Sequence, residues 1–141
     1  MAFEFPIRVY WEDTDAGGIV FYANYLKFFE RARTEWLRSL SLSQRALREG
    51  LGGGEGGMFV VVETSLKYHR PARLDDELIA TARLQEAGRV GLVIAQQVLL
   101  RQAAPQAHAL LCEGSVRVGW VHAETLKPAR IPPAILEKLS S

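Results

Sequence analysis

The sequence predicts an α+β fold in which a five-stranded antiparallel sheet wraps around one long central helix. Residues 25–40 repeat apolar side chains at helical spacing, and several of these side chains are aromatic rings. One short β-rich segment precedes this stretch and four follow it, joined by short turns that favour antiparallel neighbours. Because helical and strand patterns are separated along the chain, a parallel α/β arrangement is not expected. A helix this apolar needs cover from a sheet rather than a place on the surface.

The first half of the chain supplies one strand, one loop and the long helix. Residues 7–11 are rich in strand-forming side chains and follow Pro6, so we predict a strand there. Residues 13–20 form a loop. Asn24 is the expected helix cap, since its side chain can accept a hydrogen bond from an exposed helical N–H.

The second half supplies a short helix and four strands. Residues 42–49 fit a helix capped by Ser41 or Ser43. β-forming side chains then mark strands at residues 58–70, 77–85, 91–101 and 108–122. Pro133 is expected at the first position of a last helix that runs to Leu139. No internal repeat or linker divides the chain, so residues 1–141 are predicted to form a single domain.

A glycine-rich segment separates the short helix from the first of these four strands. Residues 50–57 read GLGGGEGG, and Gly52, Gly54 and Gly57 match the G-x-G-x-x-G pattern of dinucleotide-binding proteins. That pattern binds phosphates where it follows a strand and opens a helix, whereas here it follows a helix and precedes a strand. We therefore predict a mobile loop rather than a nucleotide site.

Charge and composition indicate a cytoplasmic protein that binds no nucleic acid and does not span a membrane. The 141 residues carry a net charge of +1, and the lysines and arginines are spread along the chain. The first residues lack a signal-peptide pattern, and no apolar run approaches the roughly 20 residues that cross a bilayer. Cys112 is the single cysteine, so an intrachain disulfide is impossible and a reducing compartment is compatible.

The stretch from Trp11 to Tyr25 concentrates the groups that reactions at a carbonyl require. Asp15 is expected to be ionised at neutral pH, since an unperturbed aspartate has a pKa of about 3.9. Gly17 and Gly18 allow positive φ and a close approach of the backbone to a ligand. The helix start that follows offers unpaired N–H groups and the positive end of the helix dipole, which stabilise an oxyanion.

Three segments of the chain resemble one enzyme family. Residues 13–26 read DTDAGGIVFYANYL and are similar to the signature of the 4-hydroxybenzoyl-CoA thioesterase family of hotdog-fold proteins. Residues 28–35, FFERARTE, and residues 68–76, YHRPARLDD, resemble the acyl-CoA thioesterase subgroup whose members often accompany the Tol–Pal envelope system. The similarity covers nearly the whole chain.

This resemblance implies a hotdog domain that hydrolyses the thioester of a short-chain aliphatic or aromatic acyl-CoA, with no further cofactor and no metal. It also implies homodimers paired through their sheets, often homotetramers, with active sites at subunit interfaces. Asp15 corresponds to the family's nucleophile or general base, and the backbone N–H of Tyr22 corresponds to an oxyanion donor. Many members of the Tol–Pal subgroup carry a histidine where this chain has Tyr22, which argues against proton transfer by a histidine here.

Further candidates come from the helix and the strand ends. Glu30 lies two turns into the helix, where related thioesterases carry acidic residues; the ordinary alternative is a surface carboxylate paired with Lys27 or Arg33. Phe21 and Phe59 suit either an aliphatic or an aromatic acyl group. Basic residues near strand ends are typical surface charges and also candidates for binding the phosphates of coenzyme A: Lys67, His69, Arg70, Arg73 and Arg89.

Three alternatives stay open at this point. Cys112 is a potential nucleophile, but it lies about 13 Å along a strand from His108, so we predict a buried, inert thiol unless His69 reaches it. A hotdog hydratase or dehydratase typically uses a histidine with a carboxylate, and no histidine lies near Asp15 in the sequence. A non-catalytic acyl-CoA binding module would bind coenzyme A tightly without turnover.

Overall fold

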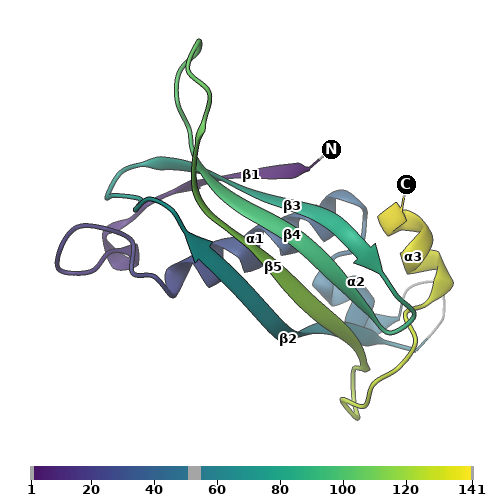
Figure 1. The fold of residues 1–141 in the computed structure, drawn as a ribbon. Coiled ribbons are helices and arrows are strands. Elements are labelled where there is room, and N and C mark those ends of the chain that lie inside the picture. Colours follow the sequence, from purple (N-terminus) through teal and green to yellow (C-terminus); the bar gives the residue numbers. More distant parts are fainter. Residues whose placement is uncertain (1, 51–54, 141) are drawn as a thin grey trace.

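The computed structural model describes residues 2–50 and 55–140, and these residues form the expected α+β fold. Five strands make one antiparallel sheet in the order β1-β3-β4-β5-β2 (Figure 1). The strands are β1 Phe3–Arg8, β2 Gly57–Tyr68, β3 Glu77–Ala87, β4 Gly91–Leu100 and β5 Ala109–His122. The helices are α1 Asn24–Ser39, α2 Gln44–Glu49 and α3 Pro133–Ser140, and a 3₁₀ turn, η1, spans Trp11–Asp13.

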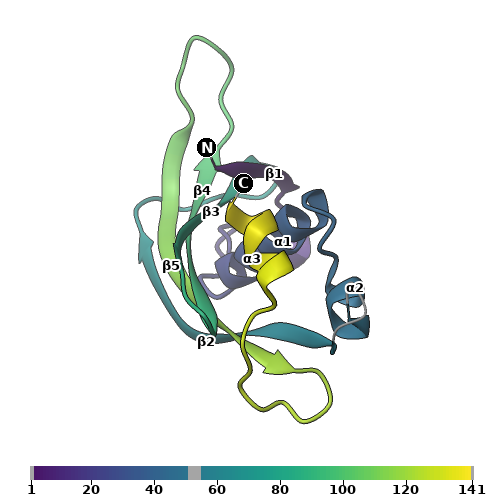
Figure 2. The ribbon, with the colours of Figure 1, turned by 90° about the vertical axis from the view of Figure 1, so that its right-hand side faces the viewer.

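Helix α1 is the centre of the core, as predicted. Figure 2 shows the three helices on one side of the curved sheet, with α1 lying along it. The buried side chains of α1 recur at helical spacing and are Tyr25, Phe28, Phe29, Ala32, Trp36 and Leu37. On β5 a glycine lets the helix approach closely, because a Cβ at Gly114 would lie 3.3 Å from the Phe29 ring and closer still to β2. The sheet therefore wraps around this apolar helix.

The predicted meander is right for three strands and wrong for one. β3, β4 and β5 are neighbours in chain order, but β2 pairs with β5 and not with β3. The free edge of β3 is taken by β1, so residues 69–76 cross from one side of the sheet to the other. This arrangement leaves β2 as an edge strand, with an irregularity in its pairing between Val61 and Glu63.

The N-terminal strand starts earlier than predicted. It spans Phe3–Arg8 rather than residues 7–11, because the whole segment pairs with β3 and its alternate side chains Phe3, Phe5 and Ile7 pack on the core. Trp11 lies outside the strand, in η1, and 84% of its surface is exposed.

The predicted helix starts are right at two helices and wrong at α1. Ala23 occupies the cap position of α1, and Asn24 is the first helical residue rather than the cap. Ser43 caps α2 by accepting a hydrogen bond from the Ala46 N–H at 3.2 Å, and α3 begins at Pro133.

Part of the glycine-rich segment, including Gly52 and Gly54, lies outside the described residues, so the predicted mobile loop is not tested there. Gly57 opens β2 and packs against the Trp120 ring, which a Cβ would meet at 2.3 Å. Among the described residues, no helix combines the length and the apolar character needed to cross a membrane.

Candidate functional site

The loop that carries Asp15 is closed on itself by backbone hydrogen bonds. The Asp15 N–H donates to the Ile19 carbonyl at 2.9 Å, and the Gly18 N–H donates to the Asp15 carbonyl at 3.1 Å. Gly18 has φ of 79°, a left-handed conformation that favours glycine. The Val20 N–H then donates to the Ala72 carbonyl at 2.9 Å, which fastens the loop to the crossover segment between β2 and β3.

The loop orients the Asp15 carboxylate and, among the described residues, leaves one of its two oxygens without a hydrogen bond. Its Oδ1 accepts a hydrogen bond from the Gly17 N–H at 2.8 Å. Its Oδ2 has no hydrogen-bond donor within residues 2–50 and 55–140, and the side chain is exposed. A Cβ at position 17 would stand 3.3 Å from Asp15 Oδ1, so glycine keeps the space beside the carboxylate open. Asp15 thus presents one free carboxylate oxygen in a fixed orientation.

Asp13 joins this loop to the start of α1. Its buried carboxylate accepts from the Tyr10 N–H at 2.8 Å. Its carbonyl accepts from the Phe21 N–H at 3.0 Å and from the Asn24 side-chain amide at 2.8 Å. Asp13 is therefore structural, and it holds the Asp15 loop and the helix start together as one unit.

The helix start offers the predicted oxyanion donor. The Phe21 carbonyl accepts from the Asn24 N–H at 2.8 Å, which fixes the peptide that carries the Tyr22 N–H. In the described part of the chain, that Tyr22 N–H has no acceptor. The side chains of Phe21 and Tyr22 are both exposed. An unpaired N–H at the positive end of a helix is suited to bind developing negative charge.

Tyr68 also belongs to this region, although the sequence did not single it out. Its hydroxyl donates to the Tyr22 carbonyl at 2.8 Å. Its ring makes edge-on contacts with the rings of Tyr22 and Tyr25. The signals in the sequence were its place at the start of the family-like segment of residues 68–76 and an aromatic residue at the end of an alternating strand, and neither assigns Tyr68 a role.

The predicted phosphate-binding residues divide into two groups. Arg73 forms a β-bridge with Ile19, and Arg70 lies between Tyr68 and the crossover contact at Ala72, so the structure brings both near the Asp15 loop. His69 instead bonds Glu113 through Nε2 at 2.7 Å.

The other two basic residues, Lys67 and Arg89, line other parts of the described structure. Lys67 pairs with Glu113 in the sheet register and lines a separate hollow of about 490 Å³ together with Arg83. Arg89 lies at the turn between β3 and β4, where its carbonyl accepts from the Ile131 N–H near α3 (Figure 1). That turn is at the opposite end of the sheet from the loop that enters α1.

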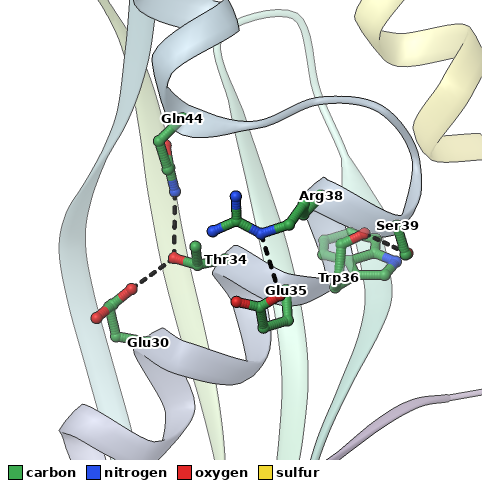
Figure 3. A network of polar contacts seen from close by, with 7 residues as sticks. All are labelled: Glu30, Thr34, Glu35, Trp36, Arg38, Ser39 and Gln44. Atoms are coloured by element: carbon green, nitrogen blue, oxygen red, sulfur yellow. Dashed lines mark hydrogen bonds and ion pairs between the residues drawn. The ribbon is translucent and has the colours of Figure 1, made fainter.

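Glu30 takes part in a polar network that the sequence did not predict. Its carboxylate accepts a hydrogen bond from the Thr34 hydroxyl, and the Gln44 side-chain amide reaches the same hydroxyl at 3.4 Å (Figure 3). The expected pairing of Glu30 with Lys27 or Arg33 is absent among the described residues.

The Arg33 side chain instead contacts the sheet. Its guanidinium donates to Gln96 Oε1 at 2.9 Å, and Gln96 is itself buried and donates to the Phe29 and Thr81 carbonyls. Burial lowers the pKa of Arg33 from its ordinary value, while the charge of Glu30 opposes that shift. Arg33 thus anchors α1 to β4 and leaves the Glu30 carboxylate to Thr34.

Glu30 and Phe59 line the same cavity, which has a volume of about 170 Å³. Side chains of α1 and α2, which are polar except for Trp36 and Leu37, form one wall, and apolar side chains of the sheet form the other. One of these apolar side chains is Val61, on the edge strand β2. At about 1.5 Å per residue, Glu30 lies about 12 Å along the helix from Tyr22. The cavity is therefore beyond the Asp15 loop in the direction of the helix axis.

Cys112 is not available as a nucleophile. Its side chain is fully buried, and desolvation raises the pKa of the thiol to about 11, with a further increase from the nearby Glu113. Among the described residues no histidine bonds to Cys112, since His69 contacts Glu113 and His108 accepts from the Gln102 N–H. This agrees with the prediction of an inert thiol.

Comparisons with known proteins place this geometry in a family. Residues 17–103 match the model of the Thioesterase superfamily. The acyl-CoA thioester hydrolase YbgC of Escherichia coli is 40% identical over 134 residues, which cover 95% of this chain and 92% of that protein. The acyl-CoA thioesterase YbgC of Haemophilus influenzae is 38% identical, with coverages of 94% and 90%.

A solved structure agrees with these sequence relatives. The crystal structure of a probable thioesterase from Bartonella henselae superposes with a TM-score of 0.84 and 32% identity, covering 94% of this chain and all of that one. The five-stranded sheet around one helix is the hotdog fold that these thioesterases share. This chain belongs to the thioesterase superfamily of hotdog-fold proteins.

Proposed function

We propose that this protein is an acyl-CoA thioester hydrolase that releases free acid and coenzyme A. One observation carries the proposal. A single hydrogen-bonded unit holds both a free Asp15 carboxylate oxygen and a Tyr22 N–H that has no acceptor among the described residues. Asp15 attacks the thioester carbonyl or removes a proton from the attacking water. The Tyr22 N–H binds the oxyanion that forms, and such a donor contributes roughly 2.7–4 kcal/mol.

The acid–base arrangement favours hydrolysis over the hydratase alternative. A hydratase or dehydratase of this fold would use a histidine beside the carboxylate. Within the described residues no histidine side chain is bonded to the Asp15 loop, and Tyr22 occupies the position of the subgroup's histidine. The proposed reaction uses coenzyme A as part of the substrate and no other cofactor.

We assign the two ends of the substrate to two parts of the chain. Arg70 and Arg73, close to the Asp15 loop, are the candidates for binding the phosphates of coenzyme A. Lys67 lines a separate hollow and Arg89 lies at the turn between β3 and β4, so they are proposed to join the site only where a second copy brings them there. Phe21 lies at the thioester end of the acyl group.

The acyl group is proposed to run along α1 towards Glu30 and Phe59. Short-chain aliphatic and aromatic acyl groups both suit a mixed polar and apolar cavity of about 170 Å³. Because Glu30 lies about 12 Å from Tyr22, Glu30→Gln is expected to alter kcat/KM more for longer acyl chains than for acetyl-CoA. An equal effect on all chain lengths would instead indicate a direct role of Glu30 in the reaction.

We also propose that the site is completed by a second copy of the chain. β2 is an edge strand of 12 residues that pairs with β5 on one side only among the described residues, and its residues Val61 and Val62 are 52% and 59% exposed. Natural proteins seldom leave such an edge free, since its N–H and C=O groups invite pairing. A β2–β2 contact would cover the side of the Glu30 cavity where Val61 lies. A tetramer, a cytoplasmic location and an association with the Tol–Pal system remain predictions from the family resemblance.

The test is release of free thiol from a panel of aliphatic and aromatic acyl-CoAs. Asp15→Asn keeps the side-chain shape and its Gly17 contact but removes the charge, so kcat is expected to fall by roughly 10²–10⁴-fold. Asp75→Asn is the matched control, because its exposed carboxylate makes no hydrogen bond or ion pair in the described structure and stands outside the loop. Full activity of Asp15→Asn would rule out its assigned role, and enoyl formation without thiol release would favour a hydratase.

A further inference from the structure

We propose that Tyr68 is a positioning residue of this reaction, which fixes the oxyanion-binding end of α1 through its hydroxyl. The inference rests on the proposed hydrolase function and adds a residue from β2 to a site otherwise built from the loop and the helix. Tyr68 does not touch the reacting atoms in this proposal. It acts on the Tyr22 carbonyl.

The contacts of Tyr68 hold its hydroxyl at that carbonyl. The hydrogen bond from the hydroxyl to the Tyr22 carbonyl is 2.8 Å long. The Tyr68 ring lies edge-on to the Tyr25 ring, with centroids 5.5 Å apart and planes at 70°. Tyr25 is buried, and its own hydroxyl accepts from the Ala72 N–H at 3.1 Å. The Tyr68 ring is therefore packed against a side chain that is itself anchored.

The helix entry needs such an anchor. The cap residue Ala23 makes no side-chain hydrogen bond, so α1 lacks the usual side-chain cap. In the described structure, Tyr68 is the residue that donates to the Tyr22 carbonyl. The preceding carbonyl, Phe21, accepts from the Asn24 N–H. The two consecutive peptides before α1 are Phe21–Tyr22 and Tyr22–Ala23. In each of them the carbonyl oxygen accepts a hydrogen bond that fixes the peptide.

Holding these carbonyls prepares the N–H groups on the same peptides. The Tyr22 N–H belongs to the Phe21–Tyr22 peptide, and the Ala23 N–H belongs to the peptide that Tyr68 holds. Neither N–H has an acceptor among the described residues. A hydrogen bond to a peptide carbonyl polarises its N–H, and two successive N–H groups form an anion-binding concavity. Tyr68 therefore orients a second donor beside the Tyr22 N–H.

The hydroxyl keeps its proton over the working pH range. Burial raises the pKa of Tyr68 above its ordinary value, with smaller increases from Cys112 and Tyr22. A tyrosine hydroxyl that stays protonated at neutral pH can donate to the Tyr22 carbonyl there.

The test compares Tyr68→Phe with Tyr25→Phe in the full-length protein, using the best acyl-CoA found for the wild type. Tyr68→Phe keeps the ring and removes the donor, so kcat is expected to fall about tenfold with KM unchanged within about twofold. Tyr25→Phe removes a hydroxyl from the same ring cluster that contacts Ala72 instead, so a lower Tm and a smaller loss of kcat than in Tyr68→Phe are expected. Amide hydrogen exchange at Asn24 and Leu26, whose N–H groups bond the Phe21 and Ala23 carbonyls, should become faster in Tyr68→Phe and remain unchanged in Tyr25→Phe.

The outcomes separate this inference from the function on which it rests. An active wild type with equal kcat and equal exchange in Tyr68→Phe overturns the role of Tyr68 and leaves the hydrolase proposal intact. A tenfold loss of kcat in both variants indicates a structural role of the ring cluster and also overturns it. A wild type that releases no thiol from any acyl-CoA overturns both proposals.

Discussion

Gly17 and Gly18 serve different purposes in the Asp15 loop, and the structure separates them. Gly17 is needed for space, since a Cβ would crowd the Asp15 carboxylate at 3.3 Å. Gly18 is needed for conformation, since its φ is 79° while a Cβ there would meet no atom within 4 Å. Gly17 therefore leaves space for the Asp15 carboxylate, and Gly18 independently allows the backbone conformation of the turn.

Gly18→Ala tests the conformational requirement. Alanine in the left-handed region costs about 1–2 kcal/mol, which corresponds to a fall in Tm of about 2–8 °C. Gly88→Ala is the control, because Gly88 has no positive φ and its added Cβ would make an ordinary contact at 3.4 Å. Calorimetry that finds equal Tm values for the two variants would contradict the strain argument.

Cys112 predicts a pH dependence of stability. Its folded pKa of about 11 lies above the ordinary value of 9.0. The folded state therefore holds the proton more tightly, so the stabilisation is complete below pH 9 and is lost as the pH rises to 11. Two pKa units correspond to about 2–3 kcal/mol. Urea unfolding at pH 8 and 10.5 should show a smaller loss of stability in Cys112→Ala than in the wild type, and parallel losses would refute the assignment.

At the residue scale, the sequence points to proposed site groups that one local motif brings together. Asp15, Gly17, Gly18 and the Tyr22 N–H lie within eight residues, and local hydrogen bonds fix them. The sequence did not predict the contact of Tyr68 with Tyr22, because these residues are 46 positions apart. No local pattern specifies which strand end meets which helix start.

The core between α1 and β5 depends on one close approach. A Cβ at Gly114 would lie 2.4 Å from the Ser65 carbonyl oxygen and 2.6 Å from a Leu66 methyl, as well as against Phe29. Both the helix and the neighbouring strand would have to move to admit it. The close packing of β5 against β2 and the Phe29 ring therefore requires a glycine here, which the sequence pattern did not distinguish from other glycines.

Gly114→Ala is expected to destabilise the protein by about 1–3 kcal/mol through overpacking. Gly119→Ala on the same strand is the matched control, since its Cβ would meet its nearest atom at 3.6 Å. Thermal unfolding should give a clearly lower Tm for Gly114→Ala than for Gly119→Ala. Similar values for the two would show that β2 and α1 adapt easily at this point.

At the element scale, the periodicity of apolar side chains predicted the helices and the long strands. It did not predict which strands are neighbours in the sheet, because that depends on tertiary contacts. Local side-chain alternation shows that residues 57–68 form a strand but not that β5 is its partner. The strand Phe3–Arg8 was misplaced because Pro6 suggested a boundary, whereas an edge strand tolerates proline.

At the scale of the whole molecule, the two edges of the sheet are unequal. β1 is a short edge strand of six residues, whereas β2 has twelve and carries exposed Val61 and Val62. Short edges resist pairing and long apolar edges promote it. The sheet therefore favours association through β2, and this asymmetry was hidden in the sequence until the strand order was known.

Replacing an edge valine with a charge should weaken this association. Val61→Lys places a cation on β2 beside the Glu30 cavity, so we expect sedimentation velocity to show a shift from dimer toward monomer and a parallel loss of thiol release. Val90→Lys is the matched control, because Val90 is 54% exposed, close to the 52% of Val61, but lies in the turn between β3 and β4. If β2 pairs with its copy, activity of Val61→Lys should recover as the protein concentration is raised, since mass action restores the dimer. A monomeric wild type with full activity would show instead that one chain holds the complete site.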